Sequence, residues 1–280
     1  MPTLATFQPS LYVAQTGTGP QPVVLVHGSF ATSRWWEPLL TALPLDEFTC
    51  YAFDLPGCGQ SGWPQSDDAY AIAAQAEALA EALAALDLWQ VHLVGHSLGA
   101  AIALTLAVTQ PARVASLTLI SAPSPSGTPT PPEGYALLEQ MRNNRDLLAQ
   151  ALASTMPSRA PDAFFQTLVD DAQRQAPAAF QATARALETW RLPAEQLAQV
   201  RLPVLLMWGD RDQIIEREDQ VALLLALPGA DNLEVLRGCG HTPILERPAD
   251  VARLLLAFLG QDFAAYAALR EQAAAQEPPV

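Results

Sequence analysis

Short apolar runs alternate with alanine-rich or amphipathic stretches along most of the chain. The apolar runs have the length of buried strands, and the stretches between them have the length and composition of helices. The predicted strands are Val23–His27, Phe48–Asp54, Val91–Val94, Val114–Ser121, Pro203–Gly209 and Leu233–Leu236, and the predicted helices are Ala69–Leu86, Leu98–Val108, Gln220–Leu227 and Ala249–Leu259. Strands that alternate with helices imply right-handed crossovers. We therefore expect an α/β protein whose mostly parallel, twisted sheet is flanked by helices.

The alternation breaks at a proline-rich stretch, APSPSGTPTPP, which spans residues 122–132. The chain then reads as helical to about Leu192, before the strand pattern resumes at Pro203. We expect a core formed by residues 1–121 and 193–280, with a helical cap, or lid, inserted at residues 122–192. Residues 261–280 read as an alanine-rich helix that frays into a disordered tail.

Composition and charge exclude several classes of partner. Half of the 280 residues are hydrophobic, which is enough for one large core. The net charge of −14 repels phosphate backbones and anionic membranes, so we expect no nucleic acid and no membrane partner. No apolar run approaches the roughly 20 residues of a membrane helix.

The three cysteines are widely spaced, as in reduced cytoplasmic proteins. The absence of lysine excludes Schiff-base chemistry.

A glycine-flanked serine stands between a predicted strand and a predicted helix. The stretch Gly95-His96-Ser97-Leu98-Gly99 has the G-x-S-x-G spacing of a nucleophile elbow. Such a turn is too tight for bulky neighbours, and it exposes the serine oxygen above the sheet. The helix N-terminus also favours negative charge that develops there. The alternative reading of Ser97 is an ordinary helix cap.

An acid and a histidine follow later strands. Asp210 and Asp212 come after the strand that ends at Gly209, and His241 comes after the strand Leu233–Leu236. The order serine, aspartate, histidine differs from the orders in chymotrypsin and subtilisin. Asp212 lies further into its loop and is better placed to face the histidine, whereas Asp210 begins the turn and is expected to bond local amides.

The stretch His27-Gly28-Ser29-Phe30 directly follows a predicted strand. A glycine there allows the backbone to approach a reacting carbonyl, so the amides of Ser29 and Leu98 could together hold an oxyanion. The alternative is an ordinary glycine turn.

Two patterns suggest cofactors but lack the required context. Gly57, Gly59 and Gly62 match G-x-G-x-x-G, yet no helix opens on the third glycine, as a dinucleotide site requires. His92 and His96 lie on a predicted strand, where four residues span about 13 Å, too far to share one metal ion. We expect no metal and no organic cofactor.

Five motifs in succession, HGSFATSRWW, DLPGCGQS, GHSLGA, WGDRD and GCGHTPILERP, resemble those of the α/β-hydrolase superfamily, in the branch with a helical cap. The resemblance runs from near the N-terminus to about Leu259. It implies that Ser97 is the nucleophile, Asp212 the triad acid and His241 the base, with Ser29 and Leu98 as backbone oxyanion donors.

These inferences predict a Ser-His-Asp hydrolase, similar to a carboxylesterase, that cleaves small, largely apolar esters through an acyl-enzyme. Phe30, Phe164, Phe165 and Trp190 are candidates for the substrate pocket, although packing inside the cap is the alternative for the last three. A thioesterase or acyltransferase is the nearest alternative function. A carbon–carbon-bond hydrolase ranks lower, because such enzymes usually carry a tryptophan after the histidine, where this chain has Thr242. A small-molecule sensor on the same scaffold is the alternative from another class. We expect a monomer or a homodimer.

Overall fold

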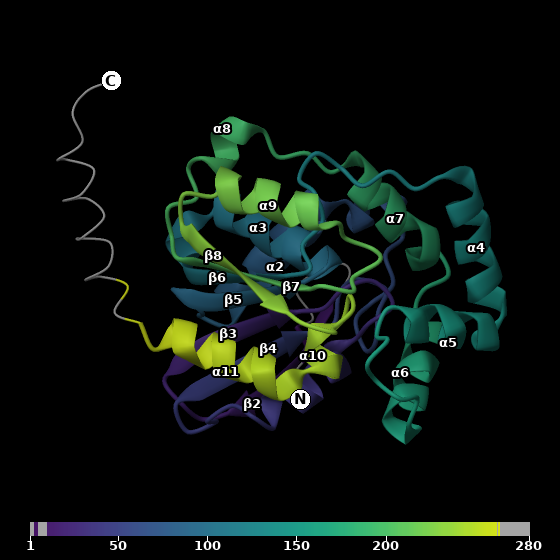
Figure 1. The fold of residues 1–280 in the computed structure, drawn as a ribbon, viewed down its shortest axis with the longest axis horizontal. Coiled ribbons are helices and arrows are strands. Elements are labelled where there is room, and N and C mark those ends of the chain that lie inside the picture. Colours follow the sequence, from purple (N-terminus) through teal and green to yellow (C-terminus); the bar gives the residue numbers. More distant parts are fainter. Residues whose placement is uncertain (1–2, 5–9, 262, 264–280) are drawn as a thin grey trace.

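The computed structural model describes residues 3–4, 10–261 and 263 of the chain (Figure 1). The predicted C-terminal helix and tail lie outside the described residues, apart from residues 261 and 263. The strands are β1 (Thr3–Leu4), β2 (Leu11–Gly17), β3 (Gln21–Val26), β4 (Phe48–Phe53), β5 (Val91–His96), β6 (Val114–Ile120), β7 (Val204–Gly209) and β8 (Ala230–Leu236). The helices are α1 (Glu37–Leu40), α2 (Ile72–Ala85), α3 (Leu98–Thr109), α4 (Pro132–Asn143), α5 (Arg145–Ser154), α6 (Ala163–Gln173), α7 (Ala179–Thr189), α8 (Ala194–Leu197), α9 (Arg217–Ala226), α10 (Pro243–Glu246) and α11 (Pro248–Leu259), with short 3-10 turns η1 (Ser33–Trp36), η2 (Asp67–Tyr70) and η3 (Pro111–Arg113).

The described strands form one sheet in the order β1-β2-β4-β3-β5-β6-β7-β8. The strands from β4 to β8 in this order pair in parallel, while β2 runs antiparallel to β4. The predicted α/β architecture with a mostly parallel sheet is therefore confirmed, and the six predicted strands and the four helices predicted between residues 69 and 259 are present with shifts at their ends. Sequence reasoning missed β1 and β2.

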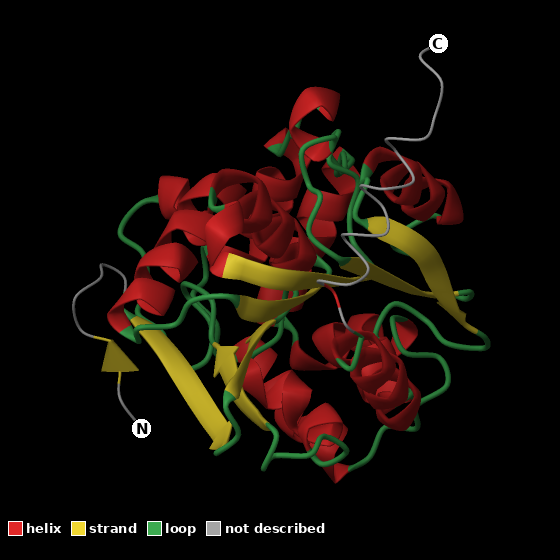
Figure 2. Ribbon diagram, turned by 90° about the vertical axis from the view of Figure 1, so that its left-hand side faces the viewer, coloured by secondary structure: helices red, strands yellow, loops and turns green. Residues whose placement is uncertain are grey.

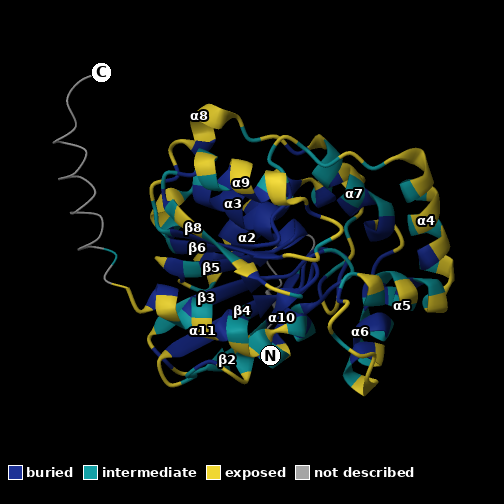
Figure 3. Ribbon diagram, viewed as in Figure 1, coloured by how far each residue is buried: buried dark blue, intermediate teal, exposed yellow. Residues whose placement is uncertain are grey.

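Helices cover both faces of the sheet (Figure 2). Successive residues of a strand point to opposite faces. Val24 and Val26 of β3 accordingly pack with α2 and α3, whereas Val23 and Leu25 pack on the other face with α1 and α11. Helix α3 is buried from Leu98 through Ala107, because it lies between the sheet and α2 (Figure 3).

Residues 122–192, here called the helical segment, separate β6 from β7 and carry helices α4 to α7. Figure 1 shows these helices at one end of the sheet. The segment contacts loops that follow the strands: the Thr155 carbonyl accepts from the His241 amide, and the Gly57 carbonyl accepts from the Ala176 amide. In a parallel sheet the loops after the strands meet at one edge. The helical segment therefore lies over the edge where candidate chemistry gathers.

Candidate active site

Ser97 occupies a strained turn between β5 and α3. Its φ of 52° and ψ of −119° lie in a region that side chains rarely adopt. Glycines on both sides make the turn possible. A side chain on Gly95 would overlap the Gly99 carbonyl, and one on Gly99 would overlap the Val26 carbonyl. The G-x-S-x-G spacing thus reflects close backbone packing, and the strained Ser97 is more than a helix cap, since its side chain makes no capping bond.

Asp212 and His241 meet across two loops. The Nδ1 atom of His241 lies 2.9 Å from Oδ2 of Asp212. Both side chains are almost fully buried, at 8% and 0% exposure for the histidine and the aspartate. Burial alone would raise the pKa of Asp212. The hydrogen bonds from His241 and from the Ile215 and Ile214 amides outweigh it and lower that pKa below its ordinary value. The carboxylate is therefore held charged against the imidazole.

The two neighbouring aspartates have different partners. Asp210 accepts from the Gly238 amide at 2.6 Å and so closes the turn between the loops after β7 and β8. Asp212 alone contacts the imidazole. This is the division expected from their positions in the loop.

His96, the residue before Ser97, contacts the His241 loop. The Nε2 atom of His96 lies 2.8 Å from the His241 carbonyl, and the two imidazole rings are 5.1 Å apart. Burial, followed by the proximity of His241, lowers the pKa of His96 to about 3. His96 is therefore neutral, and its Nε2 carries the proton that the carbonyl accepts. No hydrogen bond links Ser97 Oγ to His241 within the described residues, an arrangement found in many active sites without substrate.

The turn after β3 lies beside the serine turn. A Cβ atom on Gly28 would lie 3.0 Å from Ser97 Cβ, so this backbone passes directly over the nucleophile turn. His27 fixes the turn, since its Nδ1 bonds the Gly28 carbonyl and its Nε2 accepts from Leu55. Across the described part of the chain, neither the Ser29 amide nor the Leu98 amide donates a hydrogen bond to another group. Both remain available to an incoming oxyanion.

The four aromatic pocket candidates occupy different surroundings. Phe30 is partly exposed, and its ring lies 5.5 Å from that of Phe180 in α7. Phe165 is buried in the core shared by α5, α6 and the sheet. The Arg159 guanidinium lies 5.5 Å from the centre of the Phe164 ring. The indole of Trp190 donates to Thr105 in α3 at 3.0 Å. Trp190 thus packs between the helical segment and α3. A pocket role for these aromatics stays a prediction.

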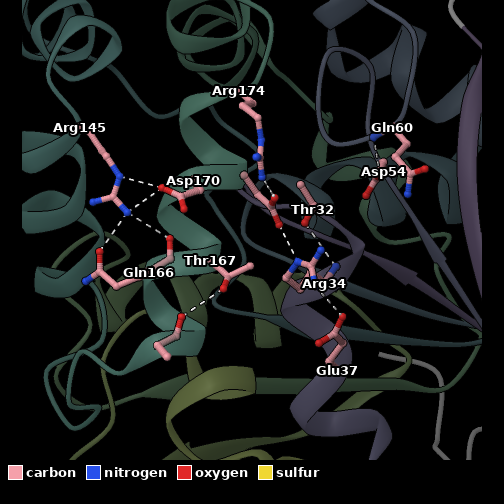
Figure 4. Close-up of polar contacts among 12 residues, drawn as sticks. Thr32, Arg34, Glu37, Asp54, Gln60, Arg145, Gln166, Thr167, Asp170 and Arg174 are labelled. Atoms are coloured by element: carbon pink, nitrogen blue, oxygen red, sulfur yellow. Dashed lines mark hydrogen bonds and ion pairs between the residues drawn. The ribbon is translucent and has the colours of Figure 1, made fainter.

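A cavity of about 450 Å³ lies elsewhere, between β2, β4, η1 and α6, and none of the predicted site residues lines it. Its charged groups satisfy one another. Arg34 bonds Asp171 at 2.7 Å and also reaches Glu37, and Arg174 shares Asp171 (Figure 4). Asp54 accepts from the backbone on both oxygens. This cavity lies between the core and the helical segment, and its charged side chains are paired with one another.

Other candidate chemistry finds no support in the described residues. They contain no cluster of His, Cys, Asp or Glu suited to a metal ion. No described helix is long and apolar enough to cross a membrane. Gly57 and Gly59 of the G-x-G-x-x-G match form a tight turn with positive φ around Asp54, not the start of a helix.

Sequence reasoning missed two groups that hold the histidine loop, which we define as residues 238–242. These are the Thr155 carbonyl, which accepts from the His241 amide at 2.8 Å, and the Glu246 carboxylate, which accepts from the Gly240 amide at 2.8 Å. Glu246 lies in the motif that carries His241, but nothing in the local pattern indicates its partner. Thr155 comes from the helical segment, where no motif marks it.

A serine in a strained strand-to-helix turn, with a buried Asp–His pair in the loops after later strands of the same parallel sheet, is the arrangement of a nucleophile elbow and its partners. Comparison with known proteins gives the family. Residues 21–248 match the model of the alpha/beta hydrolase fold family, and the chain belongs to this family.

Several proteins are similar to this chain in sequence or in structure. An uncharacterised protein of Mycobacterium tuberculosis is 31% identical over 255 residues, which cover 83% of this chain and 73% of that protein. A 2-hydroxy-6-oxononadienedioate/2-hydroxy-6-oxononatrienedioate hydrolase of Pseudomonas putida is 28% identical over 272 residues, with 89% and 91% coverage. An esterase of Exiguobacterium antarcticum has a similar structure, with a TM-score of 0.82 at 25% identity, covering 92% of this chain and 98% of the esterase.

Proposed function

We propose that the protein is a serine hydrolase that cleaves small, largely apolar carboxylic esters through an acyl-enzyme. The observation that carries this proposal is the buried His241–Asp212 pair behind the strained Ser97 turn. Similarity to an esterase of known structure and to a lipase of Psychrobacter immobilis, 27% identical over 267 residues, supports ester substrates.

Each proposed step uses a group in the described site. His241 takes the proton of Ser97 while Oγ attacks the ester carbonyl, and Asp212 stabilises the imidazolium that forms. The amides of Ser29 and Leu98 receive the oxyanion. His241 then gives its proton to the departing alcohol, and water releases the acid from Ser97 by the same route. We propose that the helical segment acts as a cap over a core of residues 1–121 and 193–280.

The charges of the helical segment favour an uncharged substrate. All six arginines of residues 122–192 already bond other groups of the protein. They pair as Arg142–Glu139, Arg145–Asp170, Arg159–Asp162, Arg174–Asp171 and Arg185–Asp67, and Arg191 donates to two carbonyls. An anionic substrate beneath this segment would have to compete with these partners for an arginine.

The second candidate is hydrolysis of a carbon–carbon bond, which the named relative from Pseudomonas putida favours. The name of that relative's substrate denotes a dianion. The paired arginines and Thr242 after His241 count against such a substrate here. Thioesters and acyl transfer share the acyl-enzyme and remain open within the proposal. We place the protein in the cytoplasm because its three cysteines are free and buried.

The experiment is trapping with a fluorophosphonate, followed by a substrate panel. Peptide mapping should find the label on Ser97, and Ser97→Ala should abolish labelling. Uncharged acyl esters and thioesters of increasing chain length should turn over faster than a dianionic ring-fission dienedioate. A label on another residue would refute the assignment. Faster cleavage of the dienedioate would select the second candidate, and tight binding of esters without turnover would indicate a sensor.

A further inference from the structure

Glu246, the last residue of α10, accepts four hydrogen bonds. Two come from the nearby histidine loop and two from Ser158, which is 88 residues away in the sequence. Its Oε1 accepts from the Gly240 amide at 2.8 Å and from the Cys239 thiol at 3.4 Å. Its Oε2 accepts from the Ser158 amide at 3.0 Å and from the Ser158 hydroxyl at 2.6 Å. One carboxylate thus joins the residue before His241 to the loop between α5 and α6.

The same loop of the helical segment also bonds the histidine loop directly. The Thr155 carbonyl accepts from the His241 amide at 2.8 Å. The hydroxyls of Thr155 and Thr242 lie 3.3 Å apart. Residues 155–158 therefore contact the chain immediately before, at and after His241.

This junction is closely packed. A Cβ atom on Gly240 would overlap Pro157 and would lie 2.6 Å from the Thr155 carbonyl. The histidine loop therefore cannot shift toward the helical segment without a steric clash. Movement in the other direction would break the bonds to Glu246 and Thr155.

We propose that Glu246 is a positioning residue that holds His241 in its catalytic geometry by clamping the histidine loop to residues 155–158. This inference rests on the proposed function, because it assigns a task to the proposed base. Asp212 orients the imidazole ring, but the ring moves with its backbone. A displacement of about 1 Å in a catalytic group can lower a rate about 10²-fold. The clamp makes the helical segment part of the catalytic apparatus as well as a cover.

Glu246→Gln tests the clamp with little change in volume. Each oxygen of Glu246 accepts from a backbone amide, so a glutamine must turn its NH₂ group toward Gly240 or Ser158 and lose the amide bond on that side, whereas the Ser158 hydroxyl can reverse and accept. Because the ring of His241 keeps its bond to Asp212, we expect a partial loss of activity and not its abolition.

The measurement is the rate at which a fluorophosphonate modifies Ser97. In that reaction Oγ bonds to phosphorus, fluoride leaves, and the serine proton passes to His241, so the rate reports on the base without any assumption about the ester. We expect Glu246→Gln to lower this rate about tenfold. With an ester that the wild type cleaves, kcat should fall by a similar factor while KM stays nearly constant.

Glu188→Gln is the matched control. Glu188 bonds the Tyr135 hydroxyl and so joins α7 to α4 within the helical segment, away from the histidine loop. This variant should react with the probe at the wild-type rate. Equal slowing of both variants would mean that any loosening of the segment lowers the rate, and would overturn the clamp. A wild-type rate for Glu246→Gln would do the same while leaving the proposed function intact. Failure of the wild type to label at Ser97 would instead refute the proposed function.

A second pair of variants decides the matter if Glu246→Gln does not fold. Ser158→Ala removes only the hydroxyl bond to Glu246 from an exposed residue. Ser154→Ala removes a hydroxyl that bonds the Ala151 carbonyl within α5. We expect Ser158→Ala to slow labelling about threefold, below the loss for Glu246→Gln because one bond of four is removed, and Ser154→Ala to leave it unchanged. Identical rates for the two would overturn the proposal.

Discussion

The serine turn and the histidine loop are built in opposite ways. Ser97 is held by close backbone packing: Gly95 lets β5 and α3 approach each other, and Gly99 lets α3 pack against the Val26 carbonyl of β3. His241 is held by groups far away in the sequence: Asp212 on the ring, His96 on its carbonyl and Thr155 on its amide. The proposed nucleophile is therefore held by backbone packing around its own motif, and the proposed base by hydrogen bonds from several distant segments. Substitutions in the serine turn and around the histidine loop should therefore have different effects on activity and stability.

Ser97→Ala is expected to have the largest effect on activity. Its Oγ makes no hydrogen bond to the described residues, so only the nucleophile is removed. Loss of the catalytic serine costs about 10⁶-fold in kcat in subtilisin. Turnover of an ester should vanish, while the melting temperature from calorimetry stays within about 2 °C of the wild type. A variant that keeps turnover would exclude Ser97 as the nucleophile.

Asp212→Asn should have the next largest effect, because it tests the ring of His241. An amide at the acid position stabilises the wrong tautomer, which costs about 10⁴-fold in trypsin-like enzymes. Asp210→Asn is the control. It weakens the bond to the Gly238 amide, so we expect about 1 kcal/mol less stability with little change in kcat. Steady-state kinetics and urea unfolding measure the two effects, and the reverse pattern would identify Asp210 as the acid.

Gly99→Ala should break the serine turn through packing alone. The added Cβ would overlap the Val26 carbonyl, and backbone cannot yield as a side chain does. We expect a loss of about 3 kcal/mol in the free energy of unfolding. Gly134→Ala in α4 is the matched control, since the closest contact of its Cβ would be the methyl group of Thr130, at 2.9 Å. Equal urea midpoints for the two variants would contradict the close packing of the turn.

Stability should also depend on pH through His96, with no effect near neutral pH and a loss that grows in acid. The folded protein holds the pKa of this histidine at about 3, against an ordinary value of 6.5. Between these values the unfolded chain binds a proton that the folded chain does not. Stability is therefore full above about pH 6.5 and declines as pH falls toward 3, by up to about 1.4 kcal/mol per pH unit. Urea unfolding at several pH values should show a shallower decline for His96→Gln, and an equal decline would exclude this histidine as a source.

The sequence predicts much of the local structure. Strand β5, helix α3 and the glycines around Ser97 form one continuous signal, because the G-x-S-x-G motif carries both glycines that the close packing requires, although the group that Gly99 packs against lies in β3. The choice of Asp212 over Asp210 also follows from position along one loop. These predictions agree with the observed contacts.

Tertiary contacts without a local signal could not be predicted. Strand β2 is mixed in composition, and its pairing with β1 and β4 defines it. Thr155 reaches the histidine loop because the helical segment folds back over the sheet edge, and Glu246 reaches it because the chain turns back into α10 directly after His241. Trp190 bonds Thr105 across 85 residues, where its sequence position suggested only a place in the cap.

The strained backbone of Ser97 affects which variants a laboratory selection for stability would favour. A glycine would adopt the same φ without penalty, and such strain amounts to about 1–3 kcal/mol. A laboratory screen that rewards heat resistance alone would therefore enrich glycine at position 97 and discard the nucleophile. Any directed evolution of this protein must score turnover in every round, because the fold itself favours the inactive variant.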